Sequence, residues 1–230
     1  MKKYYQIDCS IDRKIIGRSE LPLTVEVKDK EFLDYRKRFF YIDDYFENES
    51  GLYGDFPKGI KGKMYQRKKD PVDFMLVMPT SFNPKYIVSG KVKNIFEKIF
   101  IDKSEYHLEE LTIEGHPERF YFLFLPLLKS LEYVDYSKTI FYDSTNDNYA
   151  VFGTYHKSQI ECNKNIGYYA KKLYVAKELE SRDIINLQTS IHPFFSKKII
   201  DAFAEESILG YDIIKSGDFK IELHFGNSLS

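Results

Sequence analysis

Short apolar runs with the length of β-strands recur along this chain, and they constrain its fold more than any other feature. Such runs, bounded by glycine, proline and polar clusters, predict strands. The expected strands cover residues 3–8, 21–27, 72–78, 86–88, 106–113, 119–125, two short segments within 139–154, 172–175, 208–214 and 219–225. Helices are expected at residues 31–40, 90–100 and 195–205, and residues 41–71 are expected to be irregular.

The order of these elements predicts the fold class. Strands follow one another in runs with few helices between them, which favours an α+β fold over a doubly wound parallel sheet. We therefore expect a mostly antiparallel sheet with a few packed helices. No low-complexity linker interrupts the chain, so residues 1–230 are expected to form a single α+β unit. An N-terminal lobe over residues 1–80 and a C-terminal lobe over residues 81–230 are the alternative division.

An internal similarity suggests two related strand–helix units. Ser89-x-Lys91-Val92-x-x-Ile95-Phe96 aligns with Ser196-x-Lys198-Ile199-x-x-Ala202-Phe203. In both copies the serine is expected at a helix N-cap, where its oxygen would accept a backbone N–H. Chance similarity between two helix starts is the competing explanation, because helices commonly share such patterns.

Composition restricts the class of protein and of partner. The 230 residues carry a net charge of −1, so no overall field attracts nucleic acid or anionic membranes. Aromatic residues make up 17% of the chain, as 19 Tyr and 19 Phe, and suit strands, large packed faces and binding surfaces. The two cysteines, Cys9 and Cys162, form no C-x-x-C pair, which fits a reducing compartment.

The N-terminus and the longest apolar run bear on localisation. Asp8 interrupts the sequence after Lys2 and Lys3 before an apolar signal-peptide core can form. Residues 120–128 are apolar but contain Pro126 and are too short to span a bilayer. We therefore expect a cytoplasmic protein with no membrane partner.

The sequence contains few signs of catalytic or cofactor-binding motifs. No H-x-H, H-E-x-x-H, G-x-S-x-G or G-x-G-x-x-G motif occurs, and Ile60 stands where a P-loop would need lysine. The sequence therefore predicts no metal site, no cofactor and no enzyme. Glu26-Val27-Lys28, with Asp8 upstream, keeps a metal-dependent nuclease open as an alternative, because carboxylates and a lysine can hold an ion and an attacking water. Alternating charges on a solvated strand explain the same residues.

A cluster of acidic and aromatic residues is the candidate partner-binding segment. The residues predicted to contact a partner are Asp43, Asp44, Tyr45, Glu47 and Tyr53. Tyrosine supplies buried area in interfaces, and fixed acids steer a basic partner. A basic block between residues 58 and 69 follows, so two solvated blocks that neutralise each other are the simpler interpretation. This mixed charge argues against nucleic acid as the partner.

From about Pro71 onward the chain resembles a known family. The similarity is carried by Pro71–Phe74, Ile87–Val92, Tyr121–Phe124, Val134–Thr139, Ser190–Ile200 and Ile208–Asp212. These short motifs resemble the immunity proteins of bacterial polymorphic toxin systems, in a group first described as a domain of unknown function. In that group a strand leads into a Ser-x-Lys helix, a second such helix lies near the C-terminus, and an Asp-Tyr-x-x-Ser stretch lies between them. Thr139 replaces the expected serine here.

The resemblance implies a non-enzymatic antidote that binds and occludes a cognate toxin, with no catalytic residues. It assigns no binding residues. A small-molecule or anion-binding module that uses Lys91 and Lys198 at the two helix starts is a further alternative, because helix N-termini attract anions.

Overall fold

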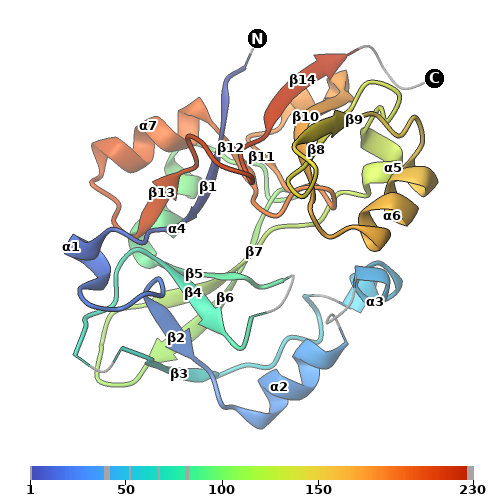
Figure 1. The fold of residues 1–230 in the computed structure, drawn as a ribbon. Coiled ribbons are helices and arrows are strands. Elements are labelled where there is room, and N and C mark those ends of the chain that lie inside the picture. The colour runs from blue at the N-terminus through green and yellow to red at the C-terminus, as the bar shows by residue number, and fades with distance from the viewer. Residues whose placement is uncertain (1, 39–41, 52, 67, 81–82, 227–230) are drawn as a thin grey trace. The chain divides into compact units, whose positions relative to one another are not determined.

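A computed structural model describes residues 2–38, 42–51, 53–66, 68–80 and 83–226 (Figure 1). The chain divides into two compact units, and neither is continuous in sequence. The first unit contains residues 1–8, 127–197 and 213–230, and the second contains residues 9–126 and 198–212. Neither unit coincides with residues 1–80 or 81–230. The expectation that the whole chain acts as one unit stays a prediction.

A closed barrel forms the centre of the second unit, with the strand order β2-β3-β6-β7-β5-β4. Its strands are β2 (Thr24–Glu26), β3 (Lys61–Met64), β4 (Phe74–Met78), β5 (Tyr86–Ser89), β6 (His107–Ile113) and β7 (Phe120–Phe124). The helical elements of this unit are α1 (Arg13–Ile16), α2 (Lys30–Lys37), α3 (Ile42–Asn48), η1 (Glu49–Gly51) and α4 (Gly90–Lys98). Helix α7 (Lys197–Glu205) and β13 (Tyr211–Ile213) lie mostly within it.

Aromatic side chains pack together in the core of this barrel unit. Phe32 of α2 stacks on Phe122 of β7, with 5.2 Å between ring centroids. Phe56 meets Phe122 and Phe124 edge to face, at 5.1 and 5.2 Å. A small barrel is filled by side chains, and edge-to-face rings add to the stabilisation that burial provides. The many phenylalanines thus serve first as core.

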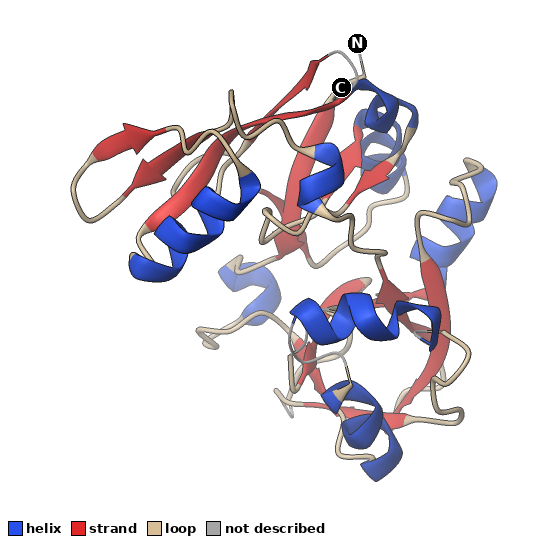
Figure 2. Ribbon diagram, turned by 90° about the vertical axis from the view of Figure 1, so that its right-hand side faces the viewer, coloured by secondary structure: helices blue, strands red, loops and turns tan. Residues whose placement is uncertain are grey.

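The first unit contains two sheets. One has the strand order β14-β10-β8-β9, from β8 (Ile140–Asp143), β9 (Asn148–Ala150), β10 (Tyr168–Ala176) and β14 (Glu222–Gly226). Helices α5 (Ser130–Tyr133) and α6 (Tyr155–Lys164) lie beside it, as Figures 1 and 2 show. Phe141, Leu173 and Val175 of this sheet are buried in the unit's core. In the other sheet, β12 (Phe194–Ser196) pairs with both β11 (Ile184–Ile185) and β1 (Tyr4–Cys9). The turn η2 (Lys177–Ser181) follows β10.

The two serines singled out by the sequence similarity occupy equivalent structural positions. Strand β5 ends at Ser89 and α4 begins at the next residue, and β12 ends at Ser196 immediately before α7. The Ser89 N–H donates to the Asp73 carbonyl at 3.0 Å, and the Ser196 N–H donates to the Asp183 carbonyl at 2.8 Å. The following N–H also donates to a third strand in each case, from Gly90 to Arg119 and from Lys197 to Lys3. The two strand–helix units are therefore similar in structure.

The ends of the two helices match as well. Phe100 and Ser207 both have left-handed backbones, with φ of 54° and 53°. The next residues, Ile101 and Ile208, donate their N–H groups to Phe96 and Phe203 at 3.0 and 2.9 Å. This is the hydrogen-bonding geometry that commonly terminates helices. The expectation of two similar strand–helix units is confirmed.

Ser89 is the N-cap residue of α4, as expected, but the expected capping bond was wrong, because its side chain makes no hydrogen bond to the helix backbone. Its hydroxyl instead donates to the carboxylate of buried Asp73 at 2.6 Å, and Ser196 donates to Asp183 at 2.7 Å. A buried carboxylate needs strong donors, and this need outweighs the weaker bond to a backbone N–H.

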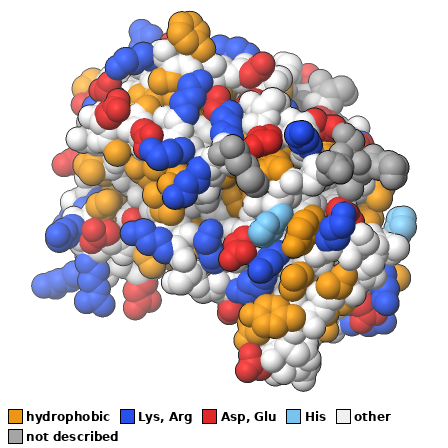
Figure 3. Space-filling view, turned by 90° about the horizontal axis from the view of Figure 1, so that it is seen from above, with side chains coloured by type: hydrophobic (Ala, Val, Ile, Leu, Met, Phe, Trp, Pro, Cys, Tyr) orange, Lys and Arg blue, Asp and Glu red, His pale blue; other side chains and the backbone are white. Residues whose placement is uncertain are grey.

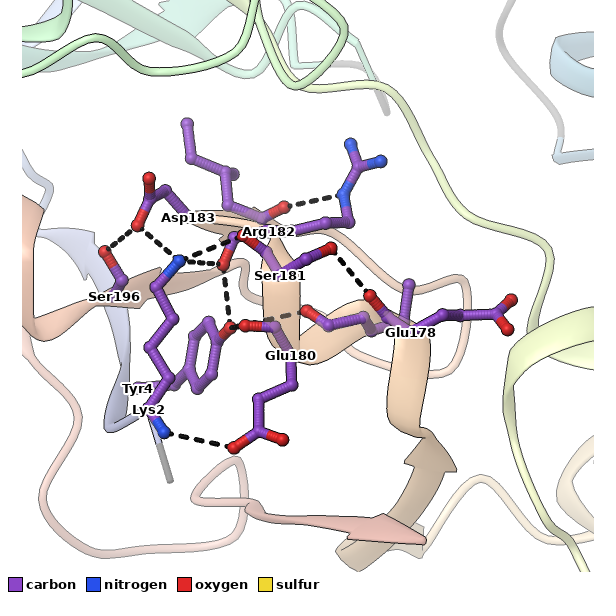
Figure 4. Close-up of polar contacts among 10 residues, drawn as sticks. Lys2, Tyr4, Glu178, Glu180, Ser181, Arg182, Asp183 and Ser196 are labelled. Atoms are coloured by element: carbon purple, nitrogen blue, oxygen red, sulfur yellow. Dashed lines mark hydrogen bonds and ion pairs between the residues drawn. The ribbon is translucent and has the colours of Figure 1, made fainter. Parts of the chain in front are cut away.

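Figure 4 shows the polar contacts around the second of these pairs. The Lys2 ammonium lies 2.7 Å from the Asp183 carboxylate and donates to the carbonyls of Ser181 and Arg182. The Tyr4 hydroxyl lies within hydrogen-bonding distance of the same turn, 2.7 Å from the Arg182 carbonyl. Lys2 and Tyr4 thus fasten the N-terminal strand to the turn that precedes Asp183.

The predicted α+β class and the mostly antiparallel pairing are confirmed. The expectation of irregular structure over residues 41–71 was wrong, because α3, η1 and β3 form there. The helix predicted from residue 195 begins at Lys197, since residues 194–196 pair as a strand. Helix α6 was not predicted. No helix in the described part of the chain is long and apolar enough to cross a membrane.

We predict that Ser89→Ala and Ser196→Ala each lower the free energy of unfolding by about 1–3 kcal/mol, because each leaves a buried carboxylate short of a donor. Urea denaturation measures the change. The double variant Asp73→Asn/Ser89→Ala should lose less free energy of unfolding than the two single variants lose in total, because the two side chains interact. Exposed Ser216→Ala is the control. Losses for Ser89→Ala and Ser196→Ala no larger than that of the control would contradict the structural role of these bonds.

Candidate binding surfaces

The acidic and aromatic segment chosen from the sequence lies in the second unit. Asp43, Asp44, Tyr45 and Glu47 belong to α3, and Tyr53 follows η1. Glu47 is exposed, Tyr53 is half-buried, and Tyr45 is 0% exposed. The side chains of Asp43 and Asp44 lie outside the described part of the structure. Tyr45 therefore contributes to the core, while Glu47 and the edge of Tyr53 face the surface.

Tyr53 packs against the strands of the barrel. Its ring stacks on His107 of β6 at 4.4 Å and meets Phe124 of β7 edge to face at 5.7 Å. Burial raises the pKa of the Tyr53 hydroxyl, with smaller contributions from Tyr45 and Glu49. A neutral ring in contact with two barrel strands fixes the position of the segment.

A network of charged groups lies beside this ring. The Lys58 ammonium donates to Glu109 at 2.5 Å, and His107 Nε2 lies 2.7 Å from the other oxygen of that carboxylate. Burial raises the pKa of Glu109, but the bonds from Lys58 and His107 outweigh this and leave the pKa below its ordinary value of 4.5. The ionised carboxylate thus stabilises the folded state here.

The residues of the nuclease alternative have separate partners. Glu26 lies 3.1 Å from Lys28 and 4.0 Å from Lys63, as expected for alternating charges on a solvated strand. Asp8, in the first unit, lies 3.3 Å from His192. Across the described residues, no group of three or more His, Cys, Asp or Glu side chains is placed to hold a metal ion.

The helix starts proposed as anion sites already face carboxylates. Asp73 lies at the start of α4 and accepts bonds from Ser89 and from the N–H of Leu209, with Lys91 at 4.0 Å. Asp183 occupies the equivalent place before α7 and accepts from Ser196. A fixed negative charge at this position opposes a bound anion.

The sheet β14-β10-β8-β9 presents a second surface, which the sequence analysis did not identify. Its outward residues alternate with buried ones and include four tyrosines, one histidine and two adjacent lysines. We call these residues the Tyr–Lys face: Ile140, Tyr142, Tyr149, Tyr169, Lys171, Lys172, Tyr174, Glu222 and His224. The lysines share one face because a bulge shifts the register between Ala170 and Lys172.

Aromatic pairs lie across neighbouring strands of this face. The rings of Tyr142 and Tyr149 are 5.3 Å apart, and Tyr174 stacks on His224 at 4.9 Å. The Lys171 ammonium lies 5.2 Å from the centroid of the Tyr142 ring. Tyr149 is 69% exposed. Cross-strand aromatic pairs stabilise a sheet, and an exposed tyrosine of this kind is a typical contact residue of interfaces.

A loop forms one wall of this face. The Lys171 ammonium donates to the carbonyls of Gly217 and Asp218, both at 2.9 Å, and so holds the loop against β10. Between the loop and the sheet lies a groove of 520 Å³, lined by Ile140, Tyr149, Lys171, Lys172, Ser216, Gly217, Lys220 and Glu222. Its size is within the range of ligand-binding clefts.

Acidic side chains lie close to both lysines of the Tyr–Lys face. Lys171 lies 3.7 Å from Asp218, and Lys172 lies 3.6 Å from Glu222. Mixed charges with exposed aromatic rings suit a protein partner, whereas a nucleic-acid surface needs a clear excess of positive charge. Figure 3 shows one face of the molecule on which Lys and Arg side chains lie among hydrophobic and acidic ones.

No protein-family model matches this chain, and no curated protein matches it. Its functional assignment therefore depends on the geometry of these surfaces and on the short motifs of the sequence.

The Tyr–Lys face leaves a signal in the sequence. Lys172, Tyr174, Glu222 and His224 alternate with apolar residues, which is the pattern of a half-buried sheet. The sequence alone does not show that these strands are neighbours, because β14 lies far along the chain from β10.

We predict that Glu109→Gln lowers the free energy of unfolding at neutral pH by about 1–3 kcal/mol, because a charged acceptor is lost. The folded-state pKa of Glu109 is depressed, so its stabilising effect is present above pH 4.5 and is lost as pH falls through the folded value. The difference between the variant and the parent should therefore shrink in acid. Urea denaturation across this pH range measures it.

The control for this test is Glu110→Gln, which changes an exposed neighbour on the same strand. A stability difference for Glu109→Gln that is independent of pH would contradict the role assigned to the ionised carboxylate.

Proposed function

We propose that this chain is a non-enzymatic immunity protein that acts in the cytoplasm and occludes a cognate bacterial toxin domain. The Tyr–Lys face carries the proposal. It combines an exposed tyrosine, cross-strand aromatic pairs and charges of both signs, a composition that suits protein interfaces.

The short motifs that resemble immunity proteins support the proposal from a second direction. Asp73, Ser89 and Ser196 lie in them, and these residues occupy the two buried junctions described above. The resemblance thus includes residues that make buried contacts in the fold. Partner-specific residues would then lie on the surface, where the family motif does not constrain them.

The proposed mechanism is steric and electrostatic occlusion. A stable complex buries on the order of 1,600 Å² in total, and a few central aromatic residues carry most of the binding energy. Tyr149 is the proposed central contact of the Tyr–Lys face, with Lys172 at its side of the groove. The chain itself performs no chemistry in this mechanism.

The candidate toxin for the experiment is the C-terminal domain of any secreted protein that is encoded immediately beside the gene for this chain. Co-expression of the chain should restore growth of cells that produce the toxin. Tyr149→Ala combined with Lys172→Glu should weaken binding at least about tenfold, by about 1.4 kcal/mol or more, because a central ring is removed and a surface charge is reversed. Calorimetric titration with a catalytically inactive toxin measures the affinity.

Tyr65→Ala is the matched control, since Tyr65 is 49% exposed and lies outside the Tyr–Lys face. Unchanged affinity in the double variant would show that the toxin contacts another surface. Failure of the parent chain to bind or to protect would overturn the proposed function itself.

The acidic segment of α3 is the second proposed contact, and exposed Glu47 supports it. We predict that reversing Asp43, Asp44 and Glu47 to lysine slows association with a basic toxin, most strongly at low ionic strength, because fixed charges steer the encounter. Stopped-flow kinetics measures the rate. Reversal of exposed Glu110, Glu114 and Glu118 is the control. Unaltered rate and affinity in the first variant would place the contact elsewhere.

A further inference from the structure

A pocket in the first unit reaches between α6 and the inner side of the sheet. It has a volume of 190 Å³. Phe141 and Ala170 of the sheet line it, Cys162 of α6 forms one wall, and Ile191 and Phe219 lie at its rim. Its chemistry is largely apolar and aromatic.

We infer that this pocket receives one aromatic side chain of the partner protein. The inference rests on the proposed function and specifies the chemistry of the contact. Four aromatic residues, Phe141, Tyr168, Tyr169 and Phe219, are among those that line the space, and aromatic groups pair favourably edge to face. Tyr169 and Phe219 already adopt this geometry, at 5.3 Å and 90°. A central aromatic residue in such a pocket is the usual anchor of a protein interface.

The rim indicates a macromolecular occupant. Ile191 is 58% exposed and Phe219 is 43% exposed. A small molecule that filled only the pocket would leave these side chains in water. A protein that inserts one ring covers them as well, and grouped exposed apolar residues mark such contacts.

The pocket adjoins the Tyr–Lys face through the loop after β13. Ser216, Gly217 and Lys220 line the groove of that face, whereas Asp218, Phe219 and Ile221 line the pocket. The Lys171 ammonium donates to the carbonyls of Gly217 and Asp218. This one side chain therefore positions the loop that lines both the groove and the pocket. A partner that lies on the Tyr–Lys face therefore reaches the pocket by crossing this loop.

Three of the polar side chains that line the pocket already have partners within the chain. Ser158 donates to the Tyr155 carbonyl at 2.6 Å, and Thr189 bonds the Tyr136 hydroxyl at 2.7 Å. Asp218 lies close to Lys171. An apolar ring that enters the pocket therefore breaks few hydrogen bonds, which favours it over a charged group.

The two cysteines provide a direct test that needs no toxin. Cys162 lines the pocket, whereas Cys9 is buried elsewhere in the fold. The probe is p-cresol, which reproduces the side chain of tyrosine. In a Cys9→Ala background, p-cresol at about ten times its dissociation constant should slow thiol labelling of Cys162 about tenfold, because an occupied pocket excludes the reagent. Labelling is run at alkaline pH, since burial raises the pKa of the Cys162 thiol.

Two variants make the test specific. Ala170→Leu fills the pocket and should abolish the protection by p-cresol, and circular dichroism checks its fold. Ile191→Ser changes only the exposed rim, so protection by p-cresol should persist while affinity for the toxin falls. Labelling of Cys162 that p-cresol does not slow would overturn the inference, as would equal toxin affinity for the parent chain and Ile191→Ser. Neither result affects the growth test of the proposed function.

Discussion

A buried hydrogen bond between aspartate and serine holds each of the two strand–helix junctions together. Ser89 donates to Asp73, and Ser196 donates to Asp183, while the backbone of each serine bonds the carbonyl of the same aspartate. In each case the strand ends at the serine and the helix begins at the next residue. A buried carboxylate without its donor would be strongly unfavourable.

The rest of the core is arranged around those junctions. In the second unit, Phe96 of α4 and Phe203 of α7 stack at 6.1 Å, so equivalent residues of the two similar helices meet. Gly210 follows α7 with φ of +98°, and a Cβ there would lie 2.2 Å from the carbonyl oxygen of Phe74. Only glycine allows this close approach to the strand that begins after Asp73.

The candidate surfaces follow from how the sheets are covered. In the second unit, Phe120, Phe122 and Phe124 share one face of β7 and are buried, and Tyr45 of the acidic segment is buried as well. The sheet β14-β10-β8-β9 packs its inner side against the core of its unit, and its outer side bears the Tyr–Lys face. Tyrosine residues therefore have two roles: buried ones such as Tyr45 contribute to the core, and exposed ones such as Tyr149 contribute to a surface.

The sequence by itself determined the α+β class, most strands and the similarity of the two strand–helix units. These are local properties, set by apolar periodicity and by turn residues over a few positions. It did not determine the partners of Ser89 and Ser196, the burial of Tyr45 or the Tyr–Lys face. Those depend on pairings between distant segments, such as β1 with β12 and β10 with β14. Tertiary structure decided them, because the role of a side chain depends on which strand lies next to it. A local sequence pattern does not specify which distant strand that will be.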